Sequence, residues 1–200
     1  MQPATTQPSS PPAAKKTKRI PGEEGVWIFI LGDICVFAVF FTYFLVQRSK
    51  RVEVFDLSQA TLNKNFGAVN TVFLLISSLF VVLAVRAMRV AERLLAQRLV
   101  VGAFLCGVAF IVVKFFEYSE RIAAKQIPST NSFYLLYFVL TGLHLFHLII
   151  GLGVLVALFF LARRADLSKH QWAFFEGGAC FWHMVDLLWL VLFPLIFLVR

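Results

Sequence analysis

The sequence has 200 residues, of which 60% are apolar and 15% charged, and its mean hydropathy is +0.80. This balance excludes an ordinary water-soluble domain and indicates that lipid surrounds most of the chain. The formal net charge of +8 does not indicate nucleic-acid binding, because Lys and Arg lie between apolar runs and form no basic stripe.

Residues 1–25 are rich in Pro, Ser, Thr, Ala and Lys. They contain no apolar core followed by a small-residue cleavage site, which argues against a secretory signal. The composition predicts a disordered tail on the cytoplasmic side, ending in a basic cluster of Lys15, Lys16, Lys18 and Arg19.

Five apolar runs follow the tail and predict an all-α bundle of five transmembrane helices over residues 26–200. The expected spans are 26–46, 68–87, 99–116, 133–162 and 173–199. The third run is barely long enough to span. The fourth is long enough that it must tilt or leave the hydrocarbon at its ends. These spans leave no room for a soluble catalytic domain.

The basic residues between the runs predict the orientation. The tail and the second and fourth connections hold 11 Lys and Arg residues, and the opposite side holds 7. Basic connections favour the cytoplasmic side, so we expect a cytoplasmic N-terminus and an external C-terminus. The chain is therefore expected to be a multi-pass membrane protein.

Eight ionisable side chains fall inside the apolar runs. An ionisable group in a span costs several kcal/mol unless it faces protein or water, so these positions are the candidates for function. They are Asp33, Lys114, Glu117, His144, His147, Glu176, His183 and Asp186.

The spacing of these residues predicts how they are grouped. Glu176, His183 and Asp186 share one helical face, and His144 and His147 are three residues apart on the preceding helix. We expect these two polar stripes to face each other or a common partner. Lys114 and Glu117 are also three residues apart and can form an ion pair or extend to the interface.

Structural roles remain the alternative for each candidate, since a His in a bundle commonly ties helices together. For Asp33 the two roles are equally open. A redox metal site is disfavoured, because the Glu-x-x-His motif that di-iron bundles repeat on two helices does not occur. Cys35, Cys106 and Cys180 lie in apolar runs without paired spacing, which indicates neither a disulfide framework nor a thiolate site.

The last two runs carry a motif with a family likeness. The segments GLHLFHLIIG (142–151) and EGGACFWHMVDLLW (176–189) resemble the final two helices of subunit III of haem-copper oxidases. The segments WIFILGD (27–33) and FEY (116–118) agree with this resemblance. The likeness covers nearly all of residues 21–200.

The resemblance implies a subunit that binds no redox cofactor or metal and packs against catalytic subunit I, which holds the haems and copper. It implies that the subunit stabilises subunit I and supports proton uptake. Family members also bind phospholipid in a cleft beside two early helices. This chain lacks those helices, so phospholipid binding stays open. The family carries Glu at the position of Asp33, and Asp33 with Pro194 resembles the accessory protein of nitric oxide reductase gene clusters.

Four functional hypotheses follow. The first is a cofactor-free subunit of an oxygen-reducing haem-copper oxidase, and the second is an accessory protein of nitric oxide reductase. The third is a bundle that conducts protons alone through Asp33, Glu176, His183 and Asp186, which lie at several depths. The fourth is an intramembrane metalloenzyme that uses the histidines.

Overall fold

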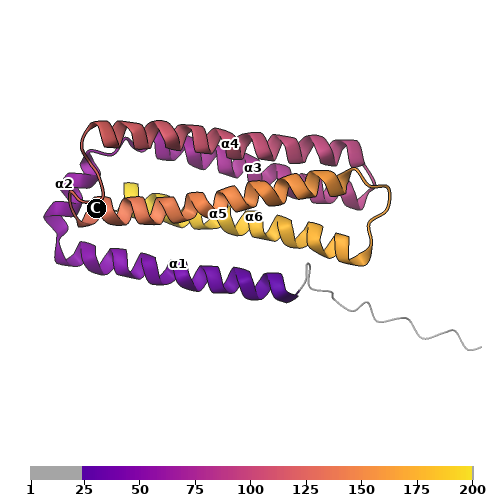
Figure 1. The fold of residues 1–200 in the computed structure, drawn as a ribbon, viewed down its shortest axis with the longest axis horizontal. Helices are drawn as coiled ribbons and strands as arrows, with labels where there is room; N and C mark the ends of the chain where they lie inside the picture. The colour runs from indigo at the N-terminus through magenta and orange to yellow at the C-terminus, as the bar shows by residue number, and fades with distance from the viewer. Residues whose placement is uncertain (1–23, 200) are drawn as a thin grey trace, which may run out of the picture.

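The computed structural model describes residues 24–199, which form six helices and no strand (Figure 1). The expected disordered tail, residues 1–25, lies outside the described residues except for its last two positions. Glu24 and Gly25 begin the first helix, so this helix starts slightly earlier than predicted.

Five of these helices are long and apolar enough to span a membrane, which confirms the predicted all-α bundle. They are α1 (Glu24–Lys50), α3 (Lys64–Arg89), α4 (Arg93–Ala123), α5 (Ser132–Ala162) and α6 (Lys169–Phe197). Each extends beyond its predicted apolar run or matches it closely. Helix α4 gains most, because the residues that flank its apolar run include the good helix formers Arg, Leu, Ala and Glu.

The remaining helix, α2 (Val52–Ala60), was not predicted. Its sequence is too short and too charged to register as an apolar run, yet Phe55 and Gln59 are buried. The Gln59 amide donates a hydrogen bond of 2.9 Å to the carbonyl of Ile196. Helix α2 therefore fastens the first connection to the end of α6.

Side-chain caps define the starts of three helices. Asn63 accepts a hydrogen bond from the amide of Asn65 at the start of α3, and Asn131 accepts one from Tyr134 at the start of α5. Ser168 and Gln171 form a reciprocal capping box at the start of α6. These caps satisfy backbone amides that have no carbonyl partner within the helix.

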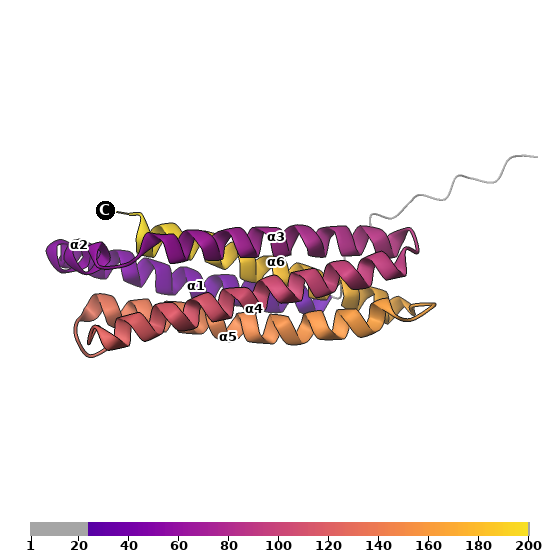
Figure 2. The same ribbon diagram turned by 90° about the horizontal axis from the view of Figure 1, so that it is seen from above.

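The helices lie nearly side by side along the long axis, with the start of α1 and the C-terminus at opposite ends (Figures 1 and 2). Helices α3 and α4 form a closely packed hairpin, and α6 packs against α1, α3 and α5. Helix α6 is the most buried spanning helix, whereas α1 lies at the edge and is the most exposed.

Trp182 of α6 is fully buried and fixes the spacing of three neighbouring helices. A Cβ atom at Gly107 of α4 or Gly151 of α5 would lie within 3.0 Å of its ring, so glycine is needed at both positions. The indole Nε1–H of Trp182 donates a hydrogen bond of 3.1 Å to Ser77 of α3. One side chain thus determines how closely α3, α4 and α5 approach α6.

Candidate functional site in the bundle

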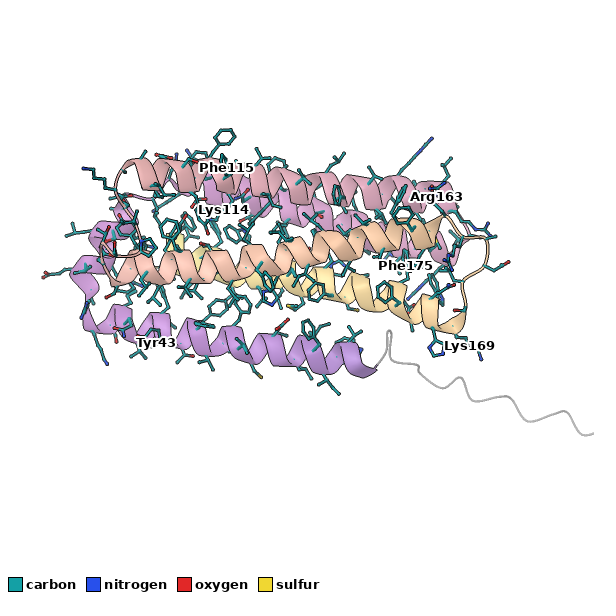
Figure 3. All side chains as sticks on the ribbon, in the orientation of Figure 1. Tyr43, Lys114, Phe115, Arg163, Lys169 and Phe175 are labelled. Atoms are coloured by element: carbon teal, nitrogen blue, oxygen red, sulfur yellow. The ribbon has the colours of Figure 1, made fainter. Side chains whose placement is uncertain are left out.

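Lys114 and Glu117 form an ion pair inside the bundle, near the end where α2 lies. The Lys114 ammonium is 3.0 and 3.1 Å from the two carboxylate oxygens of Glu117. Each residue is only 1% exposed, and Figure 3 shows Lys114 directed into the bundle interior. The predicted pairing is confirmed, and Lys114 does not extend to the interface.

Tyrosines complete what we call the Lys114 cluster, which comprises Lys114, Glu117, Tyr118, Tyr137 and Thr141. The Tyr137 hydroxyl donates to Glu117, and the hydroxyls of Tyr118 and Thr141 are 2.6 Å apart. The Lys114 ammonium also lies 5.0–5.6 Å from the ring centres of Tyr118, Tyr137, Trp189 and Phe197. Hydrogen bonds and aromatic faces together replace the hydration that both charges lose.

Arg121 lies one helical turn beyond Glu117 and is also buried. Its guanidinium donates to the carbonyl of Thr61 at 2.7 Å and to the side chain of Gln126 at 2.9 Å. Arg121 therefore ties α4 to the end of α2 and to the loop before α5. The sequence alone gives no sign of this role, because the burial of Arg121 depends on contact with the end of α2.

Asp33 of α1 meets His147 of α5. The Oδ2 atom of Asp33 is 3.4 Å from Nε2 of His147, and Nδ1–H of His147 donates to the carbonyl of Leu143 at 2.8 Å. The contact is at ion-pair distance, but Oδ2 of Asp33 has no partner at hydrogen-bond geometry among residues 24–199. The geometry therefore brings an ionisable side chain of α1 next to one of α5.

His144 lies one turn before His147 but has different surroundings. It is fully buried, and its ring packs against Phe110 at 5.6 Å and Trp189 at 5.2 Å between ring centres. Within residues 24–199, neither ring nitrogen of His144 has a hydrogen-bond partner. His144 therefore packs between α4, α5 and α6.

The candidate polar side chains of α6 all point toward α3. Glu176 pairs with Arg89 of α3 at 3.0 Å, and His183 Nδ1 is 2.7 Å from the Ser78 hydroxyl, also of α3. Asp186 is buried next to Ser78, although neither carboxyl oxygen has a partner at hydrogen-bond geometry among the described residues.

The prediction that the polar stripes of α5 and α6 face each other or a common partner is wrong. His147 turns to α1, whereas Glu176 and His183 turn to α3. The predicted shared face of Glu176, His183 and Asp186 is confirmed, since all three lie against α3. Sequence spacing identified which residues share a helix, but the neighbours of each helix depend on the three-dimensional packing.

These polar groups form separate sites. Within residues 24–199, no hydrogen bond or ion pair connects Asp33–His147 to the Lys114 cluster, or either of them to Ser78–His183. In the same residues no group of three or more His, Cys, Asp or Glu side chains is arranged to hold a metal ion. The three cysteines are free thiols.

The fold and these sites describe a multi-pass membrane protein whose buried polar groups join its helices. The family model for cytochrome c oxidase subunit III matches residues 15–199. The chain belongs to this family, and it is a haem-copper oxidase subunit III of a bacterial plasma membrane.

Three relatives illustrate this membership. Cytochrome bo(3) ubiquinol oxidase subunit 3 of Buchnera aphidicola is 26% identical over 177 residues, which cover 87% of this chain and 84% of the relative. Cytochrome c oxidase subunit 3 of Alkalihalophilus pseudofirmus is 27% identical over 175 residues, with the same coverage of both chains. Heme-copper oxidase subunit I+III of Aeropyrum pernix is 27% identical over 183 residues, which cover 87% of this chain and 22% of the relative.

Proposed function

We propose that this chain packs against the catalytic subunit of a haem-copper oxidase, stabilises it and supports its proton uptake, without binding haem or copper itself. The match to the subunit III family over residues 15–199 carries this proposal. The Aeropyrum relative supports the association, because its name assigns subunits I and III to one chain.

The exposed surface of the bundle is consistent with a partner in the membrane. Helix α1 is held mainly by α5 and α6, and one side of it carries large exposed side chains such as Ile28, Leu31 and Val39. Such a helix has apolar surface available both for lipid and for another membrane subunit.

Asp33 and His147 are the residues that we propose to support proton uptake. They contact each other beside α1, the most exposed spanning helix, whereas the Lys114 cluster is enclosed by aromatic rings. A group that gains and loses a proton near a partner subunit can buffer protons for that partner. The remaining candidates, Glu117, His144, Glu176, His183 and Asp186, are proposed to join helices.

An add-back experiment tests this proposal. Cells that lack the chain but retain the catalytic subunits should yield an oxidase that loses activity faster during turnover, and the wild-type chain should restore its lifetime. Asp33→Asn should restore assembly but only part of the lifetime, whereas Lys125→Gln, which changes an exposed loop charge, should restore both. An oxidase with equal yield, turnover and lifetime in the presence and absence of the chain would exclude the proposed role.

The relatives described above are named as oxidases, which favours oxygen over nitric oxide as the acceptor of the partner. The separation of the three polar sites also disfavours proton conduction by this chain alone. Proteoliposomes that contain only the purified chain should therefore show no change of internal pH under an imposed proton gradient.

A further inference from the structure

A cavity of about 400 Å³ lies at the end of the bundle where α1 begins, between the α3–α4 turn and the α5–α6 loop. Figure 1 shows both connections at this end, and Figure 3 places Arg163 and Lys169 beside the second one. We call it the rim cavity. Its lining includes Met88, Arg89, Arg93, Asp166, Leu167 and Trp172.

Charges of both signs line the rim cavity without neutralising each other. Arg93 and Asp166 form no ion pair with each other or with another residue in the described part of the chain. The cavity therefore offers a ligand the unpaired guanidinium of Arg93 and the unpaired carboxylate of Asp166. The guanidinium of Arg89 is also present, but it already pairs with Glu176.

This arrangement fits a zwitterion that carries a phosphate and a primary ammonium. A guanidinium binds phosphate oxygens through paired N–H donors, and a carboxylate accepts hydrogen bonds from an ammonium group. Trp172 adds an amphipathic ring of the type that gathers at the headgroup level of a membrane. A purely anionic ligand would satisfy the arginines but would be repelled by Asp166.

An apolar groove lies deeper on the same side of α4. Val100 and Phe104 follow Arg93 by seven and eleven residues, so they lie on the same helical face. With Leu155 and Phe159 of α5 they line a groove of about 160 Å³ with no polar lining. Val100 is about 10 Å further along the helix than Arg93. The groove is thus placed to take an acyl chain below a headgroup in the rim cavity.

We propose that the rim cavity binds the headgroup of phosphatidylethanolamine, with its phosphate on Arg93 and Arg89 and its ammonium on Asp166. The acyl chain lies along the groove between α4 and α5. The lipid joins the α3–α4 turn to the α5–α6 loop, two connections that are distant in sequence. This inference does not depend on the identity of the partner subunit.

Native mass spectrometry of the full chain in detergent tests the proposal, with dioleoyl phosphatidylethanolamine, phosphatidylcholine and phosphatidylglycerol as probes. The wild-type chain should bind phosphatidylethanolamine about tenfold more tightly than the other two lipids, because only its ammonium can both donate to Asp166 and accompany the phosphate. Equal affinity for phosphatidylethanolamine and phosphatidylcholine would overturn the proposal.

Two variants separate the contributions of the charges. Arg93→Gln should weaken binding of all three lipids, whereas Asp166→Asn should weaken only phosphatidylethanolamine and bring it to the level of phosphatidylcholine. The controls Arg98→Gln and Glu92→Gln change nearby charges that do not line the cavity and should leave the preference unchanged. A preference that survives Asp166→Asn contradicts the assignment. A misfolded variant would lose all lipids and could not produce this selective loss.

Soluble glycerophosphoethanolamine distinguishes the membrane lipid from a free headgroup. It shares the phosphate and the ammonium but has no acyl chain to occupy the groove. Much weaker binding than that of the lipid is expected, and equally tight binding would contradict the lipid as the ligand.

Discussion

At the scale of single residues, the buried Lys114–Glu117 pair is the feature with the clearest energetic consequence. Removing one partner of such a pair leaves an uncompensated charge, which costs about 3–5 kcal/mol. We therefore expect Lys114→Met and Glu117→Leu each to destabilise the chain strongly in thermal unfolding in mild detergent. The double variant should recover much of the loss, because it leaves no charge behind.

Phe115→Leu is the matched control for these variants, since Phe115 is the exposed neighbour of Lys114 on the same turn (Figure 3). Its unfolding temperature should stay close to that of the wild-type chain. If the double variant is less stable than both single variants, the attraction within the ion pair outweighs the cost of burying its two charges. The explanation by an uncompensated charge would then be wrong.

The Asp33–His147 contact yields a second prediction at this scale. Because the two side chains contact each other, the stability effects of Asp33→Asn and His147→Gln should not add. A double-mutant cycle in unfolding free energy should give a coupling of about 1 kcal/mol. Additive effects would show that the two residues act independently of each other.

Sequence spacing predicted some of these residue contacts and missed others for a physical reason. Lys114 and Glu117 are neighbours on one helix, so their pairing follows from helical geometry alone. Tyr137, Ser78 and Arg89 were not singled out, because each partner comes from another helix. Helical periodicity specifies a face but not the helix that covers it.

At the scale of helices, packing around Trp182 makes a testable contrast between two glycines of α5. A Cβ at Gly151 would lie 2.8 and 2.9 Å from the Trp182 ring, whereas nothing lies within 4 Å of one at Gly153. Gly151→Ala should destabilise the bundle by about 1–3 kcal/mol through overpacking. Gly153→Ala should be neutral or slightly stabilising, since alanine favours the helix.

Unfolding of the two variants by heat, followed by circular dichroism in the same detergent, compares them directly. The prediction is a lower midpoint for Gly151→Ala only. Equal midpoints would mean that α5 and α6 can separate without cost, which the buried position of Trp182 does not allow.

The five spanning helices could be predicted because long apolar runs have only one common solution in lipid. Helix α2 could not, since its nine residues mix Val, Phe and Leu with Glu, Asp and Gln and carry no membrane signal. Its stability comes from Phe55, Ser58 and Gln59, which are buried against other parts of the fold. Short helices of this kind depend on tertiary contacts.

At the scale of the whole molecule, the five spans among residues 24–199 put the start of α1 and the end of α6 on opposite sides of the membrane (Figure 1). The distribution of Lys and Arg predicts that the N-terminus is cytoplasmic. Alkaline phosphatase fused after Arg200 should then be active, and a fluorescent protein fused there should be dark. The reverse pattern would invert the orientation and would place the rim cavity on the external side.

The central claim is that this chain assembles with a subunit that carries the haem, and purification of the tagged chain from native membranes in mild detergent tests it most directly. Reduced-minus-oxidised spectra of the purified material should show haem in a fixed ratio to the tagged chain, and the material should consume oxygen. The Gly153→Ala variant should behave in the same way. Purified chain without any haem-containing subunit, from cells respiring on oxygen or on nitric oxide, would contradict the account.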